Sequence, residues 1–63
     1  MKLLDLISVM DSDTRIHIEY NYAEIYEDTV IHLLTNNTLK AYANLTVKVI
    51  WYSPIYKAIM IEL

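Results

Sequence analysis

Residues 15–29, RIHIEYNYAEIYEDT, decide the fold because they hold two short alternating segments separated by a tight turn. In residues 15–20, apolar and polar side chains alternate, which is typical of a half-buried β-strand. Asn21-Tyr22 interrupts this pattern, and asparagine tolerates the positive φ that a two-residue hairpin turn requires. Residues 23–29 then fit a returning strand. The stretch therefore predicts a β-hairpin.

The flanking sequence predicts a helix, a central helical region and a second hairpin. Residues 3–10, LLDLISVM, have an apolar stripe at helical spacing. Residues 30–44 fit either one interrupted helix or two short helices, and Asn36-Asn37 favours an interruption. Residues 45–52 and 56–63 alternate again on either side of the single proline. We therefore predict an α+β fold: a small αββαββ domain whose four-stranded antiparallel sheet has helices packed on one face.

The composition indicates one small domain, residues 1–63, that lacks the residues on which most catalytic motifs depend. The chain has no cysteine, which excludes disulfides and thiolate metal sites. It also has no glycine, on which phosphate-cradling loops, dinucleotide fingerprints and nucleophile elbows depend. A chain this short rarely encloses a cleft of enzymatic size. We therefore expect neither enzymatic activity nor a cofactor.

Charge is unevenly distributed along the chain. Residues 1–31 carry seven acidic and two basic side chains, a net −5, whereas residues 32–63 carry one acidic and three basic side chains, a net +2. The three lysines of the second half are scattered and form no basic stripe, so we expect no direct nucleic-acid binding. The acidic half favours a basic protein surface as partner. No apolar run reaches the roughly 18 residues of a membrane span, so we expect a cytoplasmic protein without membrane contact.

The first predicted hairpin concentrates tyrosine and acidic side chains. Tyrosine supplies a large, stiff contact area with a polar tip and is enriched at interface hot spots. Simple alternation along the second strand places three of these side chains on one side: Glu24, Tyr26 and Asp28. The alternative is that tyrosines merely suit a half-buried sheet. The candidate partner-binding residues are Tyr22, Glu24, Tyr26, Glu27 and Asp28.

The second predicted hairpin has an outward set that is more apolar than a solvated sheet face usually is. Its members are Ile50, Tyr52 and Met60. We interpret them as a candidate self-association surface for a homodimer. Scattered surface hydrophobes, which are common on monomeric proteins, are the alternative.

His17 and His32 are the only imidazoles in the chain. Asp11 and Asp13 lie close to His17 in sequence, which makes a weak metal site conceivable. This pattern lacks the further carboxylate and the glycine of a calcium loop. We therefore predict no metal site and interpret both histidines as surface residues.

Three stretches of the chain are similar to a group of short proteins encoded by phages and prophages of Gram-positive bacteria. MKLLDLISVMDSDTRIHI resembles their helix, acidic turn and first strand, EIYEDTV their second strand, and YANLTVKVIWYSPIYKAIMIEL their closing hairpin. Members of the group often have glycine where Asp28 stands here. The resemblance covers nearly the whole chain, although its motifs are generic and none is catalytic.

This resemblance implies a phage accessory protein in the cytoplasm of an infected or lysogenic host. Such proteins include stoichiometric inhibitors of bacterial defence. Small size and acidity make the chain look like an anti-CRISPR protein that binds a type II RNA-guided nuclease and blocks nucleic-acid loading or activation. That nuclease holds its nucleic acid in a positively charged channel. The alternative is a phage interaction module that self-assembles without inhibitory activity.

Overall fold

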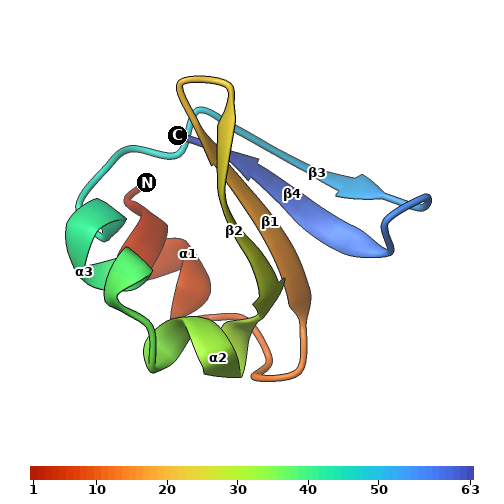
Figure 1. Ribbon diagram of the computed structural model, residues 1–63, viewed down its shortest axis with the longest axis horizontal. Coiled ribbons are helices and arrows are strands. Elements are labelled where there is room, and N and C mark those ends of the chain that lie inside the picture. The colour runs from red at the N-terminus through yellow and green to blue at the C-terminus, as the bar shows by residue number, and fades with distance from the viewer.

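The computed structural model describes residues 1–63, apart from the side chain of Thr38. It has the predicted α+β class, with three short helices and one four-stranded sheet (Figure 1). The helices are α1 (Leu3–Ile7), α2 (Val30–Leu34) and α3 (Asn37–Tyr42). The strands are β1 (Arg15–Tyr20), β2 (Ala23–Thr29), β3 (Val49–Ser53) and β4 (Ala58–Glu62).

The first hairpin forms as the sequence predicts. β1 and β2 pair antiparallel, and the connection between them is the two-residue turn Asn21-Tyr22. Both turn residues have positive φ, 52° at Asn21 and 65° at Tyr22. Two consecutive residues with positive φ produce a turn whose twist matches that of the flanking strands. The tight turn is therefore confirmed.

A one-residue bulge in β2 changes which side chains share a face. Ile18 lies opposite Tyr26, whereas Glu19 lies opposite Glu24, so Ile25 is the extra residue. Ile25 and Tyr26 both pack against the core as a result. The prediction that Tyr26 shares a side with Glu24 is therefore wrong, because simple alternation does not continue through a bulge.

The sheet is mixed, which corrects the prediction of a wholly antiparallel sheet. Its strand order is β2-β1-β4-β3, and β1 pairs in parallel with β4. The reason is the connection through α2 and α3, which returns the chain to the end of the sheet where β2 begins (Figure 1). β3 consequently runs in the direction of β2, and the following hairpin turn gives β4 the direction of β1.

The central segment forms two short helices, which settles the alternative that the sequence leaves open. α2 ends at Leu34 and α3 begins at Asn37. Side chains from α1, α2 and one face of the sheet form the core cluster, which includes Leu3, Leu33, Ile16, Ile18 and Ile61. All five of these side chains are completely inaccessible to solvent. In the described part of the chain, no helix has the length and hydrophobicity to cross a membrane.

Candidate functional site on the acidic face of the sheet

The sheet face opposite the core carries a group of glutamates around one histidine. In β1, Ile16 and Ile18 point into the core, so the alternating residues point to the other face. Cross-strand partners on β2 and β4 add further acidic side chains to the same face. We call this surface the acidic face and define it by His17, Glu19, Glu24, Glu27 and Glu62.

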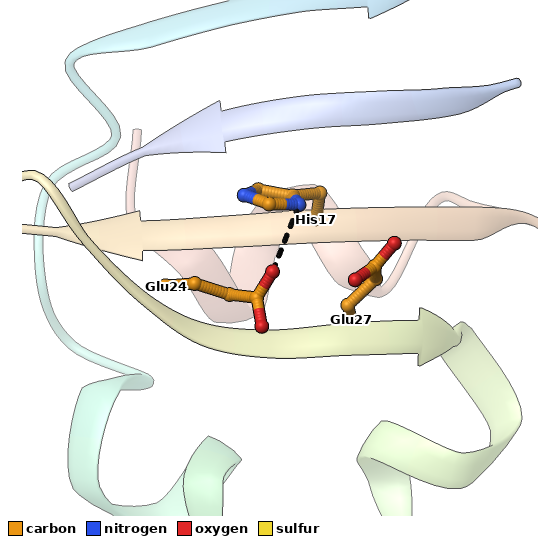
Figure 2. A group of neighbouring side chains, drawn as sticks. All are labelled: His17, Glu24 and Glu27. Atoms are coloured by element: carbon orange, nitrogen blue, oxygen red, sulfur yellow. Dashed lines mark ion pairs between the residues drawn. The ribbon is translucent and has the colours of Figure 1, made fainter. Parts of the chain in front are cut away.

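His17 lies between the carboxylates of Glu19 and Glu24, and Figure 2 shows its contact with Glu24. Its Nε2 atom is 3.0 Å from Oε2 of Glu19, and its Nδ1 atom is 3.4 Å from Oε1 of Glu24. The histidine is only 9% exposed, and Nδ1 makes no hydrogen bond. The ring of Tyr56, in the β3–β4 connection, lies beside it with 6.2 Å between ring centroids. A polar atom that is both buried and free of hydrogen bonds requires an explanation, and a bound ion or water is one of the usual ones.

The chemistry of imidazole makes this geometry informative. A neutral imidazole carries one N–H, so only one of its two nitrogens can donate a hydrogen bond. At His17 both nitrogens face a carboxylate. One nitrogen lone pair would therefore oppose an anionic oxygen unless a proton or a cation lies between them. The acidic face is thus arranged to hold positive charge.

Sequence reasoning missed this cluster for an identifiable reason. It combined His17 with Asp11 and Asp13, which are its sequence neighbours, and interpreted the histidine as a surface residue. The histidine is instead buried, and its neighbours are Glu24 and Glu27 on β2. The alternation along residues 15–20 does place His17 and Glu19 on a shared face, but the bulge hides the contribution of β2.

Of the five predicted partner-binding residues, three are exposed at the hairpin turn or on the acidic face, and two are not part of that surface. Tyr22 is 95% exposed at the hairpin turn, and Glu24 and Glu27 lie on the acidic face. Tyr26 is buried, and its hydroxyl donates a hydrogen bond of 2.6 Å to the carbonyl oxygen of Thr29. Burial, followed by the negative charge of Asp28, raises the pKa of Tyr26. The interpretation of Tyr26 as a surface contact is therefore wrong, since its side chain belongs to the core.

Asp28 lies on the other side of β2, where it is engaged locally. Its carboxylate accepts a 2.7 Å hydrogen bond from the backbone N–H of Thr29 and lies 2.9 Å from Nδ1 of His32. These two interactions, in that order, hold the pKa of Asp28 below its ordinary value. Asp28 lies near the junction of β2 and α2, and its side chain is on the opposite side of the sheet from those of Glu24 and Glu27.

The predicted self-association residues do not share a face. Ile50 and Tyr52 lie opposite Ile61 and Ile59, on the core side of the sheet, whereas Met60 lies opposite Trp51 on the acidic side. Met60 is also buried, at 7% exposure. The four residues Val49 to Tyr52 are nevertheless 45–59% exposed, because β3 is the edge strand and extends away from the helices (Figure 1).

Comparison with known proteins does not place the chain in a family. No family model matches it, and no curated protein or solved structure shows significant similarity to it. Its function is therefore inferred from the acidic face, the exposed turn and the free edge of β3.

Proposed function

We propose that this protein is a phage-encoded inhibitor that binds stoichiometrically to a basic surface of a host defence nuclease. A type II RNA-guided nuclease is the first candidate target, because its nucleic-acid channel is positively charged. The observation that supports this proposal most is the concentration of Glu19, Glu24, Glu27 and Glu62 on one sheet face. Complementary charge on two surfaces accelerates encounter and disfavours wrong partners.

The contact that we propose runs from the acidic face to the tip of the first hairpin. Glu24 and Glu27 have side chains that are 51% and 38% exposed, so a partner can reach both. Tyr22 at the turn would add an aromatic contact of large area. Tyr26 and Asp28 are excluded from this contact, because the first is buried and the second is occupied by Thr29 and His32.

The conformation of Tyr22 gives a first prediction. At a φ of 65°, a residue with a Cβ atom is strained by about 1–2 kcal/mol relative to glycine. Tyr22→Gly is therefore expected to raise the melting temperature by at least about 4 °C and to weaken inhibition of the target. Both changes are measured on one preparation, by calorimetry and by an inhibition titration.

Lys57→Gly is the matched control for this prediction. Lys57 also has a positive φ, 52°, but it lies in the connection between β3 and β4. Its replacement should raise the melting temperature for the same reason without weakening binding to a basic surface. If Tyr22→Gly inhibits as well as the wild type does, the tyrosine is not a contact residue.

The proposed function is tested by a DNA-cleavage assay with a purified type II RNA-guided nuclease. The protein is titrated before and after the guide RNA is loaded. Inhibition that saturates near an equimolar ratio supports a stoichiometric binder, and dependence on the order of addition identifies the blocked step. If nucleases from several Gram-positive hosts all cleave at the uninhibited rate, the proposal is wrong for this class of target.

A second candidate function, self-assembly, is favoured by the edge strand β3. This strand, VIWYS, has no charged residue, and its first four residues are half exposed. Natural proteins usually protect such edges with charges or proline, because an unprotected edge can pair with another strand. We propose that this edge pairs with the β3 strand of a second copy, which would give a dimer with a continuous sheet.

Sedimentation velocity distinguishes the dimer from a monomer. We expect Ile50→Asp to produce monomers, since it introduces charge at the proposed junction. Val9→Asp, at a position that is 78% exposed after α1, should leave the dimer unchanged. A wild-type protein that remains monomeric at high concentration would exclude this function.

A further inference from the structure

We propose that His17, Glu24 and Glu27 form a binding site for a divalent transition-metal ion, with Zn²⁺ as the probe of choice. Each residue offers one ligand atom, and these three atoms all lie within 4.8 Å of one another (Figure 2). β1 supplies the imidazole and β2 supplies both carboxylates. The bulge at Ile25 creates the site, because it places the two glutamates on the same side of β2. This inference concerns an ion and is independent of the proposed protein partner.

The state of the His17 side chain is the observation that points to a ligand. The residue is 9% exposed, and its Nδ1 atom is buried without a hydrogen bond. Nδ1 lies 3.4 Å from Oε1 of Glu24. Two ligands of one tetrahedral ion, each at about 2.1 Å from it, are separated by about 3.4 Å. This pair of atoms therefore has the spacing of two ligands of a shared zinc ion.

Glu19 completes the arrangement from the other side of the ring. Its Oε2 atom lies 3.0 Å from Nε2 of His17, a hydrogen-bonding distance. If Nε2 carries the proton, Nδ1 presents its lone pair toward Glu24 and Glu27. Histidines that bind metals almost always donate their second ring N–H to a carboxylate or carbonyl in this way. Glu19 is thus a positioning residue for the proposed site.

The donor set determines which ions fit. One imidazole nitrogen with two carboxylate oxygens suits zinc and similar transition metals. Calcium takes six to eight oxygen ligands, which this group does not supply. The side chains of Glu24 and Glu27 are partly exposed, so water can occupy the remaining coordination position. A divalent cation would also offset the repulsion among neighbouring carboxylates.

Metal binding should stabilise the folded protein, because the ligands are assembled only when β1 and β2 pair. At a zinc concentration about 100 times Kd, the melting temperature of the wild type is expected to rise by roughly 10–20 °C. Glu24→Gln and Glu27→Gln should each weaken zinc binding at least tenfold in isothermal titration calorimetry. Both positions are exposed, so these variants are expected to fold.

Two matched controls identify the ligands. Glu62→Gln removes a carboxylate from the same face but outside the site, and His32→Asn removes the other histidine, whose side chain is 65% exposed next to Asp28. Both controls should bind zinc as the wild type does. The proposal is overturned if the wild type shows no zinc-dependent shift, if both glutamine variants bind unchanged, or if His32→Asn abolishes binding.

Long-range ¹H–¹⁵N correlation spectra provide a readout that requires no substitution. Saturation with zinc should shift the Nδ1 resonance of His17 while Nε2 stays protonated toward Glu19. The two resonances of His32 should remain at their zinc-free positions. A shift confined to His32 would show that zinc binds elsewhere and would overturn the assignment.

Discussion

Replacing Ile18 by alanine is expected to bring the protein close to unfolding at 25 °C. Ile18 is completely buried in β1, between β2 and β4 in the sheet. A buried isoleucine-to-alanine change costs about 2–5 kcal/mol, since transfer energy is lost and a cavity remains. A chain of 63 residues has a free energy of unfolding of roughly 3–9 kcal/mol in total. The substitution therefore removes a large share of the stability.

The measurement is equilibrium unfolding in urea, with Ile31→Ala as the control. Ile31 is the same residue type, but it is 50% exposed on α2. Its replacement should change the free energy of unfolding by less than about 1 kcal/mol, because little packing is lost and alanine favours the helix. A cost at Ile18 no larger than that at Ile31 would mean that the core is not centred on β1.

Reversing both charges at Glu24 and Glu27 to lysine is expected to abolish inhibition at equimolar protein. The change removes two proposed contacts and places like charges against a basic surface, which costs several kcal/mol in related interfaces. We expect Kd to increase at least about 100-fold, which corresponds to about 2.7 kcal/mol. The residual affinity should no longer fall as salt is added, whereas that of the wild type should.

The control for charge reversal is Asp11→Lys combined with Asp13→Lys. Each double variant replaces two acidic side chains by two lysines, which raises the net charge from −3 to +1. Asp11 and Asp13 are exposed in the turn before β1 and lie outside the acidic face. Inhibition should persist in this control. If both variants lose inhibition equally, net charge and not the acidic face accounts for binding.

The same two glutamates serve the inhibitor and the metal proposals, and the nature of the substitution separates them. Glutamine removes the negative charge that a metal ion requires but introduces no repulsion toward a basic partner. Zinc binding should therefore be weakened at least tenfold in the glutamine variants, while inhibition is only moderately weakened. An inhibition assay with and without a chelator then reports whether a bound ion contributes to partner recognition.

Local sequence determines the first hairpin and the interruption of the central segment, but it does not fix the bounds of every element. The helix predicted over residues 3–10 ends at Ile7, and the strand predicted over residues 45–52 spans Val49–Ser53. The alternation of Arg15 to Tyr20 and the Asn21-Tyr22 turn predict the first hairpin, and both are present. Asn36-Asn37 predicts an interruption in the central segment, and the chain is interrupted there. These features depend on residues only a few positions apart, so neighbouring side chains and backbone preferences are sufficient to specify them.

Tertiary structure alone decides how these elements meet and which side chains share a face. The parallel pairing of β1 with β4 depends on the path of the chain through α2 and α3. The bulge at Ile25 depends on the fit of two consecutive side chains to a core that distant segments complete. That single extra residue buries Tyr26 and brings Glu24 beside His17. Contacts between residues far apart in the chain select this register, and alternation within one strand cannot report them.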